Sequence, residues 1–223
     1  MANAGDLERG LRDCNRALAL EPQYAFGYAR RGDVYRLRDE LEKALRDVAT
    51  ALRLDPKLPR AHQLRGRVYD EKHEYRQALR CFSEAMRCDP DWVNPIIARA
   101  ETYRETGNYR AALADFRRAL MVEPRSARPH NSLAWFLATC PEGKYRDGNT
   151  AVREASIACT LTQWKDAGYL DTMAAACAES GDFAQAVKRG QEAVKSVPKG
   201  ERKKSLESHL AVFRQGKPWR ESH

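Results

Sequence analysis

Several features that mark other classes of protein are missing from this chain of 223 residues. No apolar run approaches the roughly 18 residues needed to cross a bilayer, and no secretory signal is visible at the start. No N-x-[ST] site occurs, and no C-x-x-C pair or cysteine–histidine group has the spacing of a zinc site. We therefore expect a cytoplasmic protein with no metal, no cofactor and no membrane segment.

The cysteines are scattered rather than paired. We expect all six to be free, buried thiols in a reducing compartment: Cys14, Cys81, Cys88, Cys140, Cys159 and Cys177.

The net charge of +8 raises the question of a nucleic acid or an acidic membrane as partner. The surplus is spread thinly along the chain, and its largest share, a net +3, lies in residues 201–223. Acidic residues stand beside nearly every basic one. We therefore expect neither a nucleic-acid-binding nor a membrane-binding protein.

What the chain does have is an internal repeat with a constant interval of 34 residues. Five series of positions keep this interval: Pro22, Pro56, Pro90 and Pro124; Ala17, Ala51, Ala85 and Ala119; Ala44, Ala78 and Ala112; Tyr35, Tyr69 and Tyr103; and Gly32 and Gly66 with Ala100. Such a period indicates a stack of small helical units, each of which buries its apolar face against its neighbours.

Each unit is predicted to be a pair of helices. In residues 59–92 the first helix runs from about Pro59 to Lys72 and the second from about Glu74 to Cys88, where apolar residues recur at helical spacing. Asp89-Pro90 ends the second helix, because proline lacks the backbone donor that a continuing helix needs. Small residues midway along the helices allow the two to approach closely.

These residues resemble the tetratricopeptide repeat (TPR), whose pattern is W-x2-L-G-x2-Y followed by A, F, A and P within a unit of about 34 residues. The segment from Tyr28 to Tyr35, with Ala44, Val48, Ala51 and Pro56, follows it. The seventh position departs from the pattern, since it holds Arg31, Arg65 and Arg99 in place of leucine. We expect these arginines to lay their stems on apolar surface and keep their heads in water.

The resemblance implies an all-α fold, a right-handed α-α superhelix (a TPR solenoid of bacterial type) built of antiparallel helix pairs. We predict a half repeat consisting of a second helix only, then five repeats, the fourth with a loop insertion around 139–148, and a capping helix with a basic tail. Their ranges are 1–24, 25–58, 59–92, 93–126, 127–166, 167–200 and 201–223. Because the first segment is half a unit, we expect the chain to be a fragment of a longer array or to have a late start codon, in preference to a dimer interface formed by this helix.

No catalytic motif accompanies the repeats. The H-E-x-x-H, G-x-S-x-G and phosphate-loop patterns do not occur, and His62 falls at a packing position of its repeat. We therefore predict that the protein is not an enzyme, has no small-molecule substrate, and acts as a scaffold or adaptor for other proteins.

In the TPR family the first helices of successive repeats line a concave groove that holds a peptide or a partner's helix. The groove-facing positions are the second, fifth, ninth and twelfth of each repeat, which share one helix face. On this basis the predicted binding residues are Arg36, Arg60, Gln63, Arg67, Asn94, Arg104, Arg128, Asn131 and Trp135. Their surplus of arginine favours a mildly acidic protein or peptide partner. The family's clamp for a C-terminal carboxylate is not expected, because its lysine and asparagine positions are not matched.

Two alternatives stay open. One is an α-solenoid that binds RNA, which would require basic residues gathered on one face. The other is a regulatory fragment of a larger multidomain enzyme such as a protein kinase. Residues 133–141 and 169–176 resemble the closing repeats of bacterial TPR arrays, some of which are attached to such kinases. No kinase motif is present in this chain.

Overall fold

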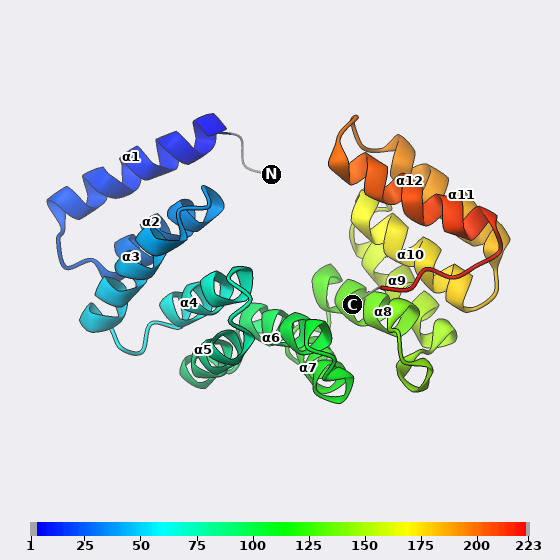
Figure 1. Ribbon diagram of the computed structural model, residues 1–223, viewed down its shortest axis with the longest axis horizontal. Coiled ribbons are helices and arrows are strands. Elements are labelled where there is room, and N and C mark those ends of the chain that lie inside the picture. The colour runs from blue at the N-terminus through cyan, green and yellow to red at the C-terminus, as the bar shows by residue number, and fades with distance from the viewer. Residues whose placement is uncertain (1–3, 222–223) are drawn as a thin grey trace. The chain divides into compact units, whose positions relative to one another are not determined.

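The computed structural model describes residues 4–221, and within them every regular element is a helix. The helices are α1 (Ala4–Leu20), α2 (Ala25–Leu37), α3 (Leu41–Leu54), α4 (Pro59–Glu71), α5 (Tyr75–Cys88), α6 (Val93–Glu105), α7 (Tyr109–Val122), α8 (Ala127–Thr139), the short 3-10 helix η1 (Gly143–Tyr145), α9 (Gly148–Leu161), α10 (Ala167–Glu179), α11 (Phe183–Lys195) and α12 (Glu201–Arg214) (Figure 1).

The described chain forms two compact units, one ending at Thr106 and the other beginning at Gly107. In the N-terminal unit α2 packs against α3 and α4 packs against α5, while α1 covers α2. In the C-terminal unit α8 packs against α9 and α10 against α11, and α12 closes the stack by packing on α11 and α10. This is the all-α helical-repeat fold, with a terminal capping helix, that the sequence predicts.

The helix ends follow the predicted signals to within a residue or two. Pro59 opens α4, and α5 ends at Cys88, directly before Asp89-Pro90. The predicted half repeat contains α1, and the predicted cap contains α12. Residues 1–3 and 222–223 of those two terminal segments lie outside the described residues.

The turns that follow α2, α4 and α6 require a left-handed backbone. Asp39, His73 and Gly107 occupy the same position in successive repeats and have φ angles of 61°, 58° and 74°. Glycine adopts this conformation without a steric penalty, whereas a residue with a Cβ pays for it. Two of these turns are therefore strained by their side chains.

Asp39→Gly is expected to raise the free energy of unfolding by about 0.5–1 kcal/mol. Relief of the left-handed strain contributes about 1–2 kcal/mol, and the greater freedom of glycine in the unfolded chain removes about 0.5–1 kcal/mol of it. Thermal unfolding of the variant measures the gain. The reverse change, Gly107→Asp, should lower the melting temperature, and a lower melting temperature for Asp39→Gly would contradict the strain argument.

The arginines at the seventh position correct the expectation that their heads lie in water. Arg31 holds Asp47 of α3 through two hydrogen bonds, Nε to Oδ2 at 2.7 Å and Nη2 to Oδ1 at 2.8 Å. Its Nη1 donates to Asn15 of α1 at 2.9 Å. Arg65 similarly donates to Cys81 Sγ at 3.2 Å. These side chains link the first helix of one pair to second helices, since a guanidinium can donate in several directions at once.

A close approach between helices places Phe82 in the N-terminal core. A Cβ added at Gly66 of α4 would lie 2.5 Å from Cε1 of the Phe82 ring, so the ring occupies space that only glycine leaves open. The ring is 1% exposed and packs with Ala78, Ala98 and Tyr69.

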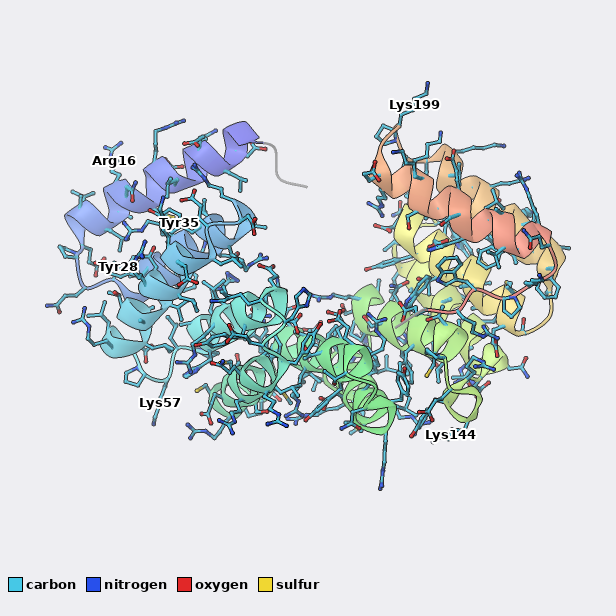
Figure 2. The ribbon with its side chains drawn as sticks, in the orientation of Figure 1. Arg16, Tyr28, Tyr35, Lys57, Lys144 and Lys199 are labelled. Atoms are coloured by element: carbon cyan, nitrogen blue, oxygen red, sulfur yellow. The ribbon has the colours of Figure 1, made fainter. Side chains whose placement is uncertain are left out.

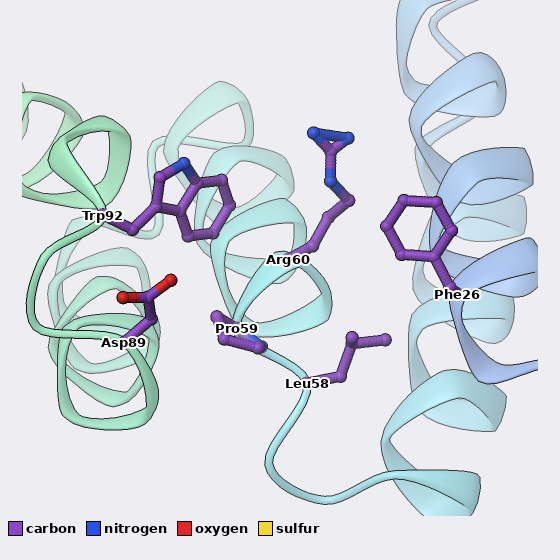
Figure 3. Close-up of a pocket in the computed structure, with 6 residues that line it drawn as sticks. All are labelled: Phe26, Leu58, Pro59, Arg60, Asp89 and Trp92. Atoms are coloured by element: carbon purple, nitrogen blue, oxygen red, sulfur yellow. The ribbon is translucent and has the colours of Figure 1, made fainter.

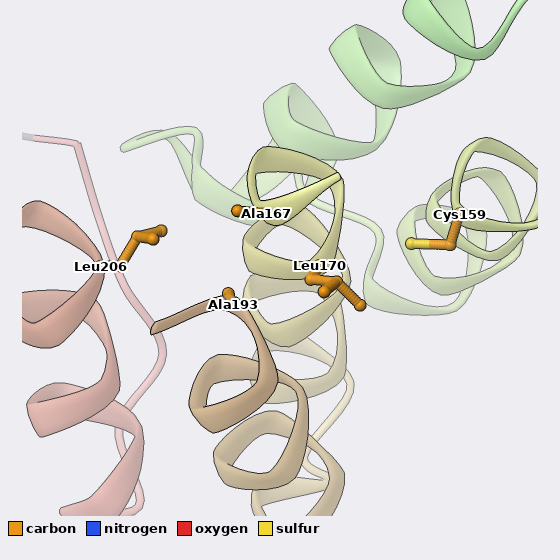
Figure 4. Packing of buried hydrophobic residues seen from close by; sticks show 5 residues of the cluster. All are labelled: Cys159, Ala167, Leu170, Ala193 and Leu206. Carbon is orange, nitrogen blue, oxygen red and sulfur yellow. The ribbon is translucent and has the colours of Figure 1, made fainter. Parts of the chain in front are cut away.

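The core of the C-terminal unit brings four helices together. Cys159 of α9, Leu170 of α10, Ala193 of α11 and Leu206 of α12 form one buried cluster with Ala167 (Figure 4). Residues from segments far apart in sequence thus bury a continuous apolar layer, as expected when stacked units share a core.

The insertion between α8 and α9 forms η1 and then starts α9 at Gly148. Asp147 caps that helix by accepting hydrogen bonds from the Thr150 amide and hydroxyl at 2.9 and 2.7 Å. A Cβ at Gly148 would lie 2.6 Å from the backbone nitrogen of Ser180, so glycine permits α9 to approach the end of α10.

Candidate partner-binding face

Of the predicted binding residues, Arg60 has the most distinctive surroundings. Its guanidinium lies 5.4 Å from the centroid of the Phe26 ring and 6.0 Å from that of Trp92 (Figure 3). The three residues line a pocket of about 250 Å3 with Leu58, Pro59 and Asp89. Among residues 4–221 no carboxylate forms an ion pair with Arg60. Its charge is therefore held between two aromatic faces, where cation–π attraction favours it.

Arg36 is in a different situation, which changes the expected character of the groove. Its guanidinium donates to Asp33 at 3.0 Å and to Glu71 at 2.6 Å. These two carboxylates outweigh the effect of burial and raise the pKa of Arg36. Arg36 is thus already neutralised within the N-terminal unit, contrary to its expected role as an available cation.

A second pocket, of about 230 Å3, lies beside Arg36 on the helices α4 and α6. Its charged lining comprises two arginines and three acidic residues: Arg36, Arg67, Asp70, Glu71 and Glu101. Burial raises the pKa of the Asp70 carboxyl, although a hydrogen bond from the Thr102 hydroxyl at 2.7 Å opposes the rise. This part of the unit is therefore not basic, unlike the surroundings of Arg60.

Gln63 lies one helical turn after Arg60 on α4. Its side chain is only 7% exposed, and its Nε2 is buried without a hydrogen-bond partner among the described residues. A buried amide group without a partner costs about 1–3 kcal/mol. Asn94 and Arg104 lie on α6 of the same unit and are half-buried.

The C-terminal unit carries the other three predicted residues, all on α8. Arg128 is half-buried, and Asn131 has a buried Oδ1 that lacks a partner among the described residues. Trp135 is covered by the chain's own C-terminal segment, because its Nε1 donates to Glu221 Oε1 at 2.8 Å. Sequence reasoning did not anticipate this contact.

His62 and His130 have structural roles. His62 contacts the Pro56 carbonyl oxygen at 2.9 Å through Nε2, and His130 makes the same contact with Pro124. His130 Nδ1 also lies 2.7 Å from Glu154 Oε2. Within the described part of the chain, no three or more His, Cys, Asp or Glu side chains are grouped so that they could hold a metal ion.

Exposed basic charge elsewhere is dispersed. Lys57 and Lys199 lie on connecting segments and Lys144 lies in η1, and all three are exposed (Figure 2). None of the helices in residues 4–221 is long and apolar enough to span a membrane.

Two family models match the chain, both described as tetratricopeptide repeat. One covers residues 59–92 and the other residues 96–126. A comparison with curated protein sequences gave no significant match.

Several solved structures resemble most of the chain. YrrB, described as a TPR protein with an unusual peptide-binding site, is 18% identical with a TM-score of 0.57; the match covers 87% of this chain and 97% of YrrB. PilF of Pseudomonas aeruginosa is 17% identical, with a TM-score of 0.69 over 86% of this chain and 85% of PilF. Yeast Tom70 is 17% identical, with a TM-score of 0.73 over 96% of this chain but only 44% of Tom70.

The chain therefore contains tetratricopeptide repeats at residues 59–92 and 96–126, within a helical-repeat fold that resembles the solved structures of tetratricopeptide repeat proteins. Proteins of this family are in general non-enzymatic scaffolds that bind other proteins or peptides.

Proposed function

We propose that this protein is a scaffold or adaptor that binds an acidic segment of a partner protein on the first helices of its repeats, with Arg60 as the principal anchor. The observation that carries the proposal is the Arg60 guanidinium, which has no carboxylate partner among the described residues and lies between Phe26 and Trp92.

Arginine in such a setting is suited to a carboxylate. Its planar fork donates two parallel hydrogen bonds, and the flanking rings hold it in place before the partner arrives. Arginine and tryptophan are also the residues that most often dominate the binding energy of interfaces. The pocket beside them would accept an apolar side chain next to the acidic residue of the partner.

Gln63 and Asn131 supply the second element of the proposal. Each has one buried polar atom without a partner among the described residues. Amide side chains of this kind can hydrogen-bond the backbone of a peptide, whatever its sequence. Arg67, Asn94 and Arg104 complete the proposed face of the N-terminal unit, and Arg128 belongs to the proposed face of the C-terminal unit. Arg36 is paired with acidic residues and Trp135 is covered by the C-terminal segment, so neither serves as an anchor.

Arg60→Glu is expected to weaken binding of acidic peptides by about thirtyfold, which corresponds to roughly 2 kcal/mol at an interface anchor. The measurement is fluorescence anisotropy with a pool of short acidic peptides and with their neutral Asn/Gln counterparts. The matched control is Arg80→Glu, which makes the same charge change at an exposed position of α5. Equal binding of acidic and neutral peptides, or equal losses in both variants, would contradict the proposal.

An RNA probe tests the first of the two alternatives, an RNA-binding solenoid. Binding of RNA that weakens steeply with salt and depends on Arg60 would favour an RNA-binding solenoid over a protein scaffold.

We also propose a reducing, cytoplasmic setting, because all six cysteines are free thiols in the structure.

A further inference from the structure

The segment that follows α12 folds back onto the C-terminal unit. Gly216, with a φ of 66°, ends the helix, and the Lys217 amide returns to the Val212 carbonyl oxygen at 3.3 Å. From there the chain runs back from the end of α12 toward α8 (Figure 1). We call residues 216–221 the C-terminal tail.

The tail is held by an aromatic contact at its centre. The Trp219 ring lies 4.3 Å from the ring of His209 on α12, measured between centroids. His209 is itself fixed by Asp171 of α10, with Nδ1 and Oδ2 2.8 Å apart, and its ring lies 5.7 Å from that of Trp135. The His209 ring of α12 thus lies against both Trp219 of the tail and Trp135 of α8.

Polar contacts hold the end of the tail at the end of α8. Arg220 donates to the Ala138 carbonyl oxygen at 3.2 Å and forms an ion pair with Glu179. The Glu221 amide donates to the Thr139 carbonyl oxygen at 3.3 Å, and the Glu221 carboxylate accepts from Trp135. These carbonyl groups lie in the last turn of α8, where the helix offers no partner of its own.

The tail therefore covers positions assigned above to partner binding. Trp135 and Ala138 are the ninth and twelfth residues of their predicted repeat. The corresponding residues of α10, Ala175 and Ala178, are each only 2% exposed. An extended segment of this same chain occupies the face of the C-terminal unit on which a partner segment would lie.

We propose that the C-terminal tail is an intramolecular ligand of this face, and that the face recognises an extended segment in which a tryptophan is followed by a basic and an acidic residue. The tail blocks that face until a partner segment of similar chemistry displaces it. The inference concerns the C-terminal unit, where it shares the α8 face with the proposed function, and it does not depend on Arg60.

The contacts that hold the tail are of a kind that a partner segment can replace. They comprise a few hydrogen bonds, one ion pair and one ring contact on a short tether, rather than a buried apolar core. A tethered ligand has an effective concentration on the order of millimolar, so the tail outcompetes a free peptide of the same sequence. If the face is open about 1% of the time, a free peptide binds the intact chain about 100-fold more weakly than an open one.

The test uses a fluorescein-labelled peptide with the sequence of residues 215–221 and the full-length chain. The variant Trp219→Ala with Arg220→Ala removes the ring contact and the ion pair of the tail from the chain but leaves α12 and the face in place. We expect the variant to bind the peptide about 100-fold more tightly than the unmodified chain does. A peptide carrying the same two substitutions should bind neither protein.

A chain ending at Gln215 provides the second measurement. It should bind the peptide at least as tightly as the double variant, and Trp135→Ala in this shortened chain should abolish binding. Circular dichroism verifies that each protein keeps its helix content. If either folded variant fails to bind the peptide, or if the unmodified chain binds it equally well, the tail is a fixed structural cap and the proposal is wrong. Because the probe is the chain's own tail, failure of the acidic-peptide experiment leaves this result unaffected, and the reverse also holds.

Discussion

Phe82→Ala is expected to lower the free energy of unfolding by about 3–5 kcal/mol, as is typical when a fully buried phenylalanine is truncated. The ring is 1% exposed and lies against the backbone of α4 at Gly66, where a Cβ would come within 2.5 Å of it. Because Gly66 belongs to a helix, α4 cannot collapse locally to fill the space. The substitution therefore leaves a cavity between α4 and α5.

Urea unfolding followed by far-ultraviolet circular dichroism measures the loss, and hydrogen exchange locates it. In a repeat array each unit contacts only its neighbours, so the amides of α4 and α5 should lose protection while those of α10 and α11 keep it. The matched control is Phe26→Ala, the same truncation at a ring that is 37% exposed, for which we expect less than about 1 kcal/mol. Equal losses at Phe82 and Phe26 would contradict this account of the core.

Cys159 and Cys177 are expected to react with iodoacetamide at pH 8 about 100-fold more slowly than thiols of ordinary pKa. Burial raises the pKa of each from 9.0 to about 11, and the nearby Arg189 only partly offsets this effect. Since the thiolate is the reacting form, a rise of two pKa units lowers its fraction about 100-fold. Cys159 also donates to the Tyr169 carbonyl oxygen at 3.3 Å, which further retains its proton.

Mass spectrometry after timed alkylation of the native protein checks this expectation, with the half-buried Cys88 as the internal comparison. In urea all six thiols should react at similar rates.

The folded state holds the thiol protons of Cys159 and Cys177 more tightly than the unfolded chain does. The raised pKa values of these two thiols therefore contribute fully to the free energy of unfolding below pH 9. This contribution is lost as the pH rises from 9 toward 11. Rapid native alkylation of Cys159 would show that the thiol is not buried.

Much of the fold could be predicted because its signals are local. The constant repeat interval, Pro59 at a helix start and Asp89-Pro90 at a helix end specify helix pairs through backbone hydrogen bonds between near neighbours in sequence. The turn residues Asp39 and His73 are the exception. Gly107 at the equivalent position indicates a left-handed backbone from the sequence, but Asp39 and His73 do not, and the structure shows that they adopt it too.

The candidate site was harder to predict, because the state of each groove side chain depends on contacts made across the fold. Arg36 and Arg60 both stand at groove-facing positions, yet Glu71, 35 residues away, pairs with the first, while aromatic rings flank the second. The partners of Arg31 lie 16 residues away in each direction. In other repeat sequences, an arginine at the seventh position with polar residues 16 residues before and after it would indicate the same contacts.

The sequence by itself determined that this protein is a stack of helix pairs, because helices, their ends and a repeated apolar face follow from residues close together in the chain. Only the tertiary structure decided which arginine keeps an unpaired charge and where the C-terminal tail lies. Trp135 and Glu221 are 86 residues apart, and their hydrogen bond exists only because α12 packs on α10 and directs the tail toward α8. Long-range contacts of this kind depend on how the helices pack, and no local pattern specifies them.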